Sequence, residues 1–94
     1  MPKLTVQVRT HDNLLKLLAA SESHAWVVGS DKENFITNVQ IVNWDGTQMI
    51  EGVFDPASPR RKDDGRLILQ YFDARIVNCG VSFASQNPVQ YIQE

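Results

Sequence analysis

A basic cluster on a polar segment carries the most concentrated chemistry in this sequence. Arg60, Arg61 and Lys62 are adjacent, and Arg66 follows in the same segment. Arginine presents a planar fork of donors that fits phosphate and carboxylate oxygens, so the cluster can bind a nucleotide phosphate or an acidic protein surface. Three acidic residues of the segment offset its charge: Asp55, Asp63 and Asp64. Two interpretations stay open, an anion- or partner-binding loop and a solvated connector.

Aromatic side chains can complete such a site by stacking. Trp44 lies beside a predicted turn, where an exposed indole is typical of an interface hot spot or a stacking platform. Tyr71 lies within a strand-like segment, where core packing is the ordinary role of an aromatic ring. The candidate binding residues are therefore Arg60, Arg61, Lys62, Arg66, Trp44 and Tyr71.

The side chains that usually perform catalysis form no recognisable constellation. His11 and His24 are the only histidines and Cys79 is the only cysteine, which leaves no zinc-ligand set of the usual spacing. A reactive cysteine would need a base brought to it by the fold. The spacing of the acidic residues near the predicted strands pairs none of them for acid–base catalysis: Asp45, Glu51, Asp55 and Asp73. The sequence therefore predicts a non-catalytic protein with no metal and no cofactor.

The composition excludes several broad classes. The chain has 94 residues, of which 43% are hydrophobic and 21% charged, so it has the usage of a folded domain and not of a disordered segment. Nine basic and eleven acidic residues give a formal net charge of -2, which argues against long nucleic acid as the ligand. No apolar run is long enough to span a bilayer and no secretion signal is evident, so no membrane association is expected. A single cysteine fits a reducing compartment, and we expect a cytoplasmic location.

Hydrophobic periodicity predicts a strand, a helix and a second strand in the first third of the chain. Residues 4–9 alternate between apolar and polar side chains, as in a half-buried strand. Residues 12–20 carry a leucine stripe typical of a short helix, and residues 25–28 form an apolar run that indicates the second strand. Because a helical connection separates the two strands, they can be parallel. Residues 29–34 are turn-like.

The predicted helix is too short to be stable alone, so it must pack against a sheet. Its stripe predicts docking through Leu14, Leu17 and Leu18. Thr10 or Asp12 can cap the helix by accepting from backbone N–H groups of its first turn.

A hairpin is predicted in the middle of the chain. Residues 35–44 form a long strand with apolar side chains on both faces, so we expect it to be covered on both sides. The Asp45-Gly46 pair favours a type I′ turn. Residues 38–44 and 47–54 should therefore pair as an antiparallel hairpin.

The C-terminal half contains a long loop and three further strands. Two prolines and the basic cluster predict an exposed loop over residues 55–65. Residues 66–78 return to strand character, and this run is long enough that a bulge or bend is expected near Asp73. Residues 81–84 and 89–92 are the last short strands.

These elements predict a single globular domain over residues 1–94, of the α+β class. We expect one short helix packed on a curved, mostly antiparallel sheet of about five to seven strands, or on a partly open barrel.

Part of the sequence resembles the Sm-like RNA-binding fold. The resemblance is carried by residues 39–46, 52–55 and 67–69, together with Asp73. It implies a short helix, a curved sheet and ring-shaped oligomers. It covers under half of the chain, and residues 4–28 have no counterpart in it, so no RNA-binding residue is carried over.

These observations favour a non-catalytic small binding protein, an adaptor or inhibitor that acts through protein–protein contacts or self-association. A sheet of several strands leaves at least one free edge, which pairs readily with another chain, so a homodimer or higher oligomer is predicted. The alternative is a binder of a nucleotide or another phosphate-containing small ligand, held by the loop that contains Arg60, Arg61 and Lys62.

Overall fold

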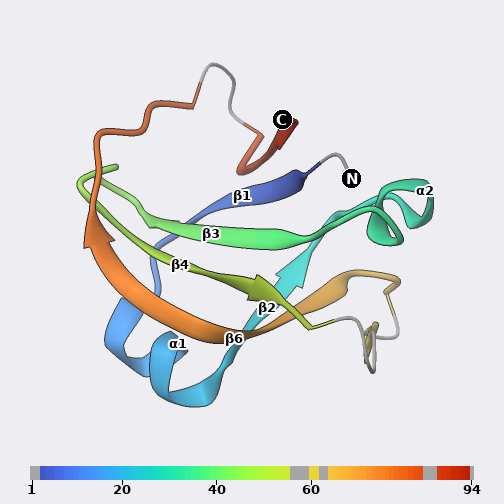
Figure 1. Cartoon of the computed structure of the whole chain (residues 1–94), viewed down its shortest axis with the longest axis horizontal. Coiled ribbons are helices and arrows are strands. Elements are labelled where there is room, and N and C mark those ends of the chain that lie inside the picture. The colour runs from blue at the N-terminus through green and yellow to red at the C-terminus, as the bar shows by residue number, and fades with distance from the viewer. Residues whose placement is uncertain (1–2, 56–59, 62–63, 84–86, 94) are drawn as a thin grey trace.

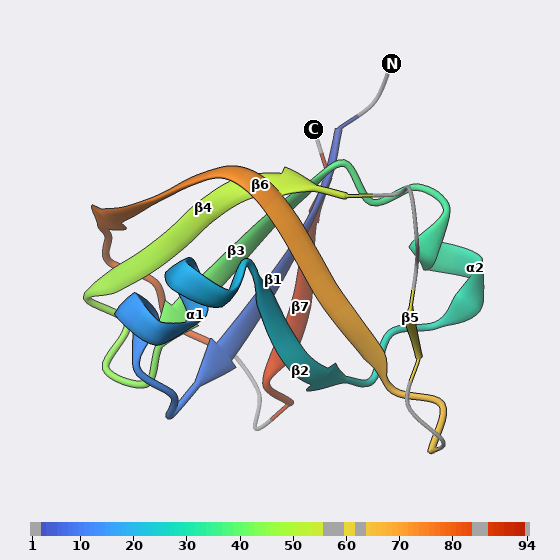
Figure 2. The same ribbon diagram turned by 90° about the horizontal axis from the view of Figure 1, so that it is seen from below.

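The computed structural model describes residues 3–55, 60–61, 64–83 and 87–93. The described residues contain seven strands and two short helices, in the order β1 (Leu4–Thr10), α1 (Leu14–Ala20), β2 (Glu22–Trp26), α2 (Ser30–Glu33), β3 (Asn38–Asn43), β4 (Gln48–Phe54), β5 (Arg60–Arg61), β6 (Leu67–Asn78) and β7 (Val89–Gln93). The strands form one mixed sheet in the order β2-β6-β4-β3-β1-β7, and β5 pairs with β6 beside this path. Figure 1 and Figure 2 show this sheet curling into a half-barrel with α1 beside β6. The broad prediction of a curved sheet with few helices is confirmed.

Within the described sheet, one neighbouring pair of strands is parallel. β1 runs parallel to β3, with Val6 opposite Val39, and the other pairs are antiparallel. The parallel pairing that the helical connection would allow between the first two strands does not occur, because β2 pairs with β6 instead. The reason lies at Ser21, whose φ of 57° reverses the chain at the end of α1. The Ser21 C=O accepts from the Tyr71 N–H (3.2 Å), which aligns β2 with β6.

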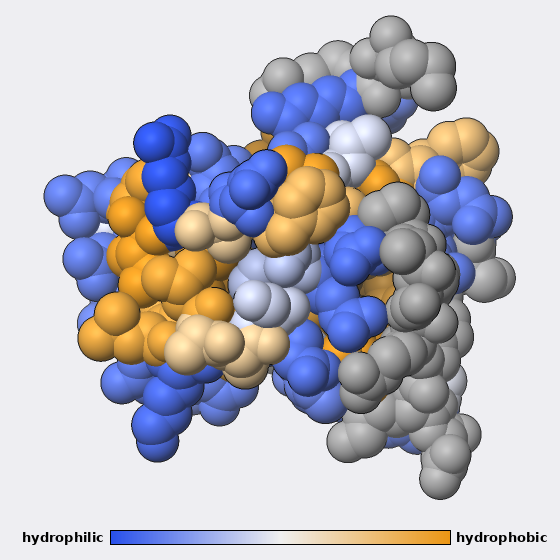
Figure 3. Space-filling view, turned by 60° about the horizontal axis from the view of Figure 1, so that its bottom comes forward, coloured by the Kyte–Doolittle hydropathy of each residue, from blue (hydrophilic) through white to orange (hydrophobic). Residues whose placement is uncertain are grey.

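Helix α1 docks as its leucine stripe predicts. Leu14 is buried in the core, and Leu17 and Leu18 are half-buried against it. Leu15, which is 69% exposed, is on the solvent side of the helix. Apolar surface gathers over this part of the molecule in Figure 3.

The N-cap of α1 is Asn13, so the prediction of Thr10 or Asp12 is wrong. The Asn13 Oδ1 accepts from the N–H groups of Leu15 (2.8 Å) and Lys16 (3.3 Å). The Thr10 hydroxyl oxygen accepts from the Asp12 N–H instead (3.0 Å), so it shapes the turn that precedes the helix. Two short polar side chains in series thus guide the chain from β1 into α1.

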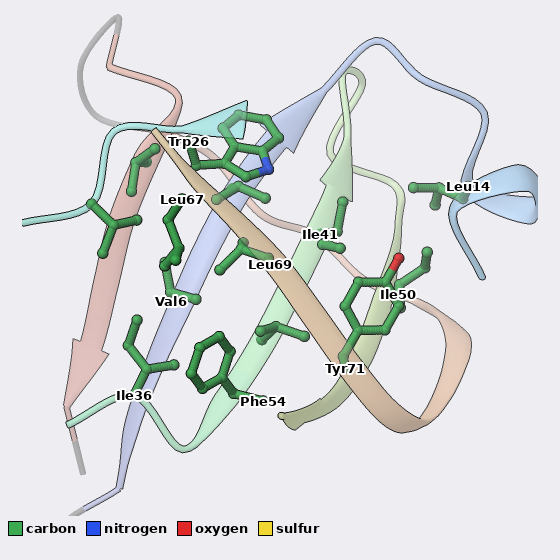
Figure 4. Packing of buried hydrophobic residues seen from close by; sticks show 14 residues of the cluster. Val6, Leu14, Trp26, Ile36, Ile41, Ile50, Phe54, Leu67, Leu69 and Tyr71 are labelled. Carbon is green, nitrogen blue, oxygen red and sulfur yellow. The ribbon is translucent and has the colours of Figure 1, made fainter. Parts of the chain in front are cut away.

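The hydrophobic core fills the inside of the half-barrel. Figure 4 shows side chains of β1, β3 and β4 meeting those of β2 and β6. Five of the residues labelled there have almost no exposed surface: Val6, Ile41, Ile50, Leu67 and Leu69. Trp26 of β2 is also buried, and its indole N–H donates to the Ser23 hydroxyl (3.0 Å). This bond satisfies the single polar atom of the indole.

A β-bulge bends β6, which confirms the prediction near Asp73. The pairing of β4 with β6 shifts register between Glu51 and Val53, and Asp73 adopts a φ of 49°. Gly52 lies at the bend, where an added Cβ would come within 2.9 Å of the Ala74 Cβ. The bend lets the beginning of β6 cross the core and pair with β2 while the rest of the strand continues along β4.

Strands β3 and β4 form the predicted antiparallel hairpin, with Val42 opposite Met49. The predicted type I′ turn is wrong, because that turn needs a positive φ at both central residues and Asp45 does not have one. The Gly46 N–H donates to the Asn43 C=O (3.0 Å), and Gly46 has a φ of 75°. The glycine therefore ends a turn in a loop of more than two residues, which explains why it alone needs the left-handed conformation.

Residues 29–34 hold a helix where a turn is predicted. The Gly29 C=O accepts from the N–H groups of Lys32 (3.0 Å) and Glu33 (3.1 Å), which closes the single turn of α2. The Lys32 Nζ lies 5.1 Å from the centre of the Tyr91 ring, so this turn packs beside β7.

The segment between β6 and β7, the C-terminal arm, is described at residues 79–83 and 87–88. Figure 1 shows its described parts on the side of the sheet away from α1. The Val81 N–H donates to the Gly46 C=O (3.0 Å), and this bond goes to the hairpin loop and not to a strand. The strand predicted at residues 81–84 is therefore absent from residues 81–83, and Ala84 lies outside the described residues.

Val39 and Val42 of β3 are both fully buried, which confirms that this strand is covered on both faces.

Candidate functional site

The sequence predicts a loop over residues 55–65, and part of it is instead paired with the sheet. Arg60 and Arg61 form β5, whose backbone pairs with Ile68 and Leu67 at the beginning of β6. The chain therefore runs back along β6, and the two arginines are anchored through their backbone.

The other basic residues give no contact that identifies a ligand. Lys62 lies outside the described residues. Arg66 is exposed, with its Nε 3.6 Å from the Asp64 carboxylate, and its own N–H is also accepted by that carboxylate (3.0 Å). An exposed ion pair of this kind contributes little to stability. Anion binding by this segment stays a prediction.

Trp44 is partly exposed, at 41%, but neighbouring side chains cover its ring. The His11 ring stacks on the indole with centroids 3.7 Å apart, and the Arg9 guanidinium lies 4.0 Å from the ring centre. Contact distances leave no room for both groups on one face, so they cover opposite faces. Arg9 also donates from Nε and Nη2 to the Trp44 C=O (2.9 and 2.7 Å). The indole is thus held in a sandwich, with its faces occupied.

This sandwich is far from the basic segment. Figure 2 shows β5 and the loop between β3 and β4 at opposite ends of the molecule. The structure therefore does not unite Trp44 with Arg60, Arg61 and Arg66 in one site. The sequence did not predict the contact of Arg9 with Trp44, because the two residues are distant in the chain. The alternation of residues 4–9 shows only that the Arg9 side chain points away from the core.

Tyr71 belongs to the core and not to a binding surface. It is 3% exposed, and its hydroxyl donates to the Leu17 C=O (2.6 Å). Burial, aided by the negative charge of Glu22, raises the pKa of Tyr71 to about 12. The stacking role predicted for this ring is wrong, because no face of it is open to a ligand. The alternation that groups Tyr71 with Leu67 and Leu69 was the available signal.

Cys79 has the surroundings of a structural thiol. It is half-buried, and its Sγ donates to the Gly46 C=O (3.4 Å). Burial raises the pKa of the thiol, so the reactive thiolate is scarce at neutral pH. Among the described residues, no three histidine, cysteine or acidic side chains gather as they would around a metal ion.

Two of the candidate carboxylates come together on the outer face of the sheet. Glu51 and Asp73 line a groove of about 360 Å³, together with Lys3 and Arg75. The Glu51 carboxylate lies 3.7 Å from the Arg75 guanidinium; the arginine side chain is largely exposed and the glutamate side chain partly so. The groove therefore holds a solvated ion pair of balanced charge, which gives no preference for an anion or a cation.

The sheet path ends in two edge strands, β2 and β7, each with a single strand neighbour among the described residues. An edge strand directs half of its backbone N–H and C=O groups away from the sheet, where another strand can pair with them. These two edges differ in the backbone groups and side chains that they present.

The hydrogen bonds at the beginning of β7 determine which of its groups point outward. The Arg9 N–H donates to the Pro88 C=O (2.9 Å), which makes this a hydrogen-bonded pair of the antiparallel ladder. Because bonded and non-bonded pairs alternate, Gln90 and Ile92 direct their N–H and C=O groups at β1. Val89, Tyr91 and Gln93 direct theirs to the free edge.

Part of that edge is already occupied. The Val89 N–H is accepted by the Asn87 Oδ1 (3.1 Å), which agrees with its outward direction. Within the described residues, no hydrogen bond involves the backbone N–H of Tyr91 or Gln93. These two residues therefore present the open part of the edge.

Side chains hold β7 firmly against the sheet. The Gln90 Nε2 donates to the Gln7 Oε1, and the Gln7 Nε2 donates to the Gln40 Oε1 (2.7 Å), so an amide ladder crosses three strands. Val89 is buried in the core, and Tyr91 is half-buried beside Lys32. The open edge is thus presented in a fixed conformation.

β2 presents a different edge. Its pairing with β6 shifts register between Ser23 and Trp26, so the edge is irregular. The polar pair of Glu22 and His24 lies along it, with the Glu22 carboxylate 2.8 Å from the imidazole Nε2. Bulges and charged side chains are the features by which proteins keep an edge from pairing. The free edge of β7, which is regular and uncharged, is therefore the better candidate site.

Among the described residues, no helix combines the length and the apolar character needed to cross a lipid bilayer. Comparison of the chain with protein-family models, with curated proteins and with solved structures finds no match.

Proposed function

We propose that this chain is a non-catalytic binding protein that takes a strand of another polypeptide onto the free edge of β7. One observation carries the proposal: the backbone groups of Tyr91 and Gln93 point outward from a regular strand without charged side chains. In strand addition the main-chain hydrogen bonds supply affinity and the alternate side chains supply specificity.

The edge is organised for this role before any partner arrives. The amide ladder through Gln90 and the burial of Val89 fix β7 against β1. A preformed edge loses little conformational entropy on binding, which favours affinity for a short strand. An adaptor or an inhibitor can act through such an edge without any catalytic group.

The experiment uses a proline to remove one outward donor. Gln93→Pro removes an N–H that points away from β1, so the ladder inside the sheet is kept. Gln93→Ala is the matched control, because it shortens the same exposed side chain and keeps the N–H. Native mass spectrometry of protein purified from cells is used to detect complexes of all three proteins.

We expect wild type and Gln93→Ala to carry a polypeptide partner, identical or different, that Gln93→Pro loses. Complexes that survive in Gln93→Pro, or the absence of any complex in the wild type, contradict the proposal. Recovery of a bound phosphate compound in place of a polypeptide favours the alternative function of the basic segment.

A further inference from the structure

We infer that the strand taken onto β7 is β7 of a second copy, paired antiparallel about a twofold axis at Ile92. The inference rests on the proposed function of the β7 edge and identifies its occupant. Three features of the edge support it: the alternation of inward and outward backbone groups, the Asn87 side chain that occupies the Val89 N–H, and the side chains on the two faces of the strand.

The open groups of β7 are complementary to themselves. Tyr91 and Gln93 each offer one N–H and one C=O to the outside. With the axis at Ile92, Tyr91 pairs with Gln93 of the partner subunit and exchanges both bonds with it. The symmetry repeats the same bonds on the other side of the axis, so the outward N–H and C=O groups of both Tyr91 and Gln93 are satisfied.

The contact of Asn87 with Val89 selects this register over its neighbour. With the axis at Tyr91, Gln93 would face Val89 of the partner subunit, whose N–H already donates to Asn87. The Gln93 C=O would then lack a donor. The axis at Ile92 places no pair on Val89 and leaves the Asn87 bond intact.

The side chains favour the same arrangement. Ile92 is 37% exposed, and its backbone pairing with Thr5 places it on the outer face of the sheet. On the axis it meets Ile92 of the partner subunit as a non-hydrogen-bonded pair, in which side chains approach most closely. β7 itself carries no charged residue from Val89 to Gln93. The charged residues beside Tyr91, Asp31 and Lys32 of α2, have opposite signs. An apolar residue at the centre and polar residues around it is the usual anatomy of an interface.

Pairing of β7 with β2 of another copy is the competing form of self-association. It joins two different surfaces and so builds a ring or an open chain of molecules instead of a twofold dimer. The register shift between Ser23 and Trp26 and the negative charge of Glu22 oppose it. Pairing of β7 with β7 of a second copy is therefore favoured over pairing of β7 with β2.

Site-specific disulfide formation tests the occupant and the register together. Residues on the axis in a non-hydrogen-bonded pair have Cα atoms about 4.5 Å apart, within the range of a disulfide. We replace Cys79 by serine to remove the native thiol and introduce Ile92→Cys, with Gln90→Cys and Gln93→Cys as matched controls at neighbouring positions of the same strand. Under mild oxidation, Ile92→Cys should form a covalent dimer at least about tenfold faster than either control.

A second measurement keeps the inference testable without new thiols. Sedimentation equilibrium of the native chain should show a reversible dimer of the 10.6 kDa protein. Gln93→Pro should raise the dissociation constant on the order of tenfold or more, because it removes one bond on each side of the axis, whereas Gln93→Ala should not.

The outcomes separate the two proposals. Crosslinking that is fastest at a position other than 92 overturns the register. A wild-type monomer that nevertheless loses a different polypeptide partner in Gln93→Pro overturns the second copy and leaves the proposed function standing. A wild-type monomer with no partner of any kind overturns both.

Discussion

The two edge strands solve the same topological problem in opposite ways. β2 is buried through its side chains, since Trp26 and Ser23 enter the core, and its outer edge is made irregular and charged. β7 is regular and uncharged, and it leaves its outer edge open. A sheet that does not close must end somewhere, and here one end is protected while the other is prepared for pairing.

The difference predicts that changes in β2 act on folding and that changes at the outer edge of β7 act on association. Both strands lie at the end of the same sheet, so position alone does not separate them. What separates them is the depth of their side chains and the direction of their backbone groups.

The largest effect is expected in β2. Trp26→Ala should lower the free energy of unfolding by about 3–5 kcal/mol, because it removes a buried aromatic ring and leaves a cavity. Val27→Ala is the control, since the adjacent side chain is 68% exposed and its loss should cost less than about 0.5 kcal/mol. Chemical denaturation measures both. A cost for Trp26→Ala below about 1 kcal/mol would mean that β2 is not anchored by its side chain.

A substitution in the hairpin loop should loosen β7 more than β2. Gly46→Ala should cost about 2–4 kcal/mol, because Gly46 has a positive φ and an added Cβ would lie 2.2 Å from the Val81 carbonyl oxygen of the arm that leads to β7. Gly65→Ala separates the two causes, since Gly65 has a φ of 84° but no atom near its added Cβ.

Amide hydrogen exchange locates the effect of Gly46→Ala. The N–H groups of Gln90 and Ile92, which face β1, should exchange faster in the variant, while those of β2 change less. Equal costs for Gly46→Ala and Gly65→Ala would show that the arm moves aside without consequence.

An alkaline titration of stability tests the burial of Tyr71, which lies on β6, the neighbour of β2. The pKa of Tyr71 is about 12 in the folded chain and about 10 when unfolded, so between these values the folded state holds the proton that the unfolded state has lost. Stability should therefore be unaffected below about pH 10 and fall as the pH rises toward 12.

Tyr71→Phe checks the origin of this decline. At neutral pH it should cost about 1 kcal/mol, because it removes the bond to the Leu17 C=O, which keeps its bond from the Ser21 N–H. Its alkaline decline should be smaller than that of the wild type. Tyr91→Phe is the comparison on the β7 side, and burial also raises the pKa of Tyr91. Identical pH profiles for wild type and Tyr71→Phe would contradict the assignment.

The smallest effect on folding is expected at the β7 edge. Ile92→Lys places a charge on the outer face and should change the free energy of unfolding by less than about 0.5 kcal/mol. It should abolish self-association, because the two lysines would meet on the axis. Thermal unfolding and sedimentation of the same sample measure both effects. A dimer that persists would move the interface away from β7.

Local patterns in the sequence predicted much of the architecture. Alternation in residues 4–9 marked β1, the leucine stripe marked the docked face of α1, and the length of residues 66–78 implied the bulge at Asp73. These features depend on neighbours within a few residues, so the sequence carries their full cause. The alternation within residues 66–78 groups Tyr71 with Leu67 and Leu69, which indicates a buried side chain and not a binding role.

Only the tertiary structure determined which strands and which side chains lie next to one another. The choice of β6 as the neighbour of β2 depends on the reversal at Ser21 and on which surfaces are left to cover, and no local pattern contains either. The sandwich of Trp44 joins residues from β1 and the hairpin loop that are adjacent only after β1 has paired with β3. The candidate site has the same origin. Which groups of Tyr91 and Gln93 point outward follows from the ladder between β1 and β7, and a shift of one residue in that register would turn them inward.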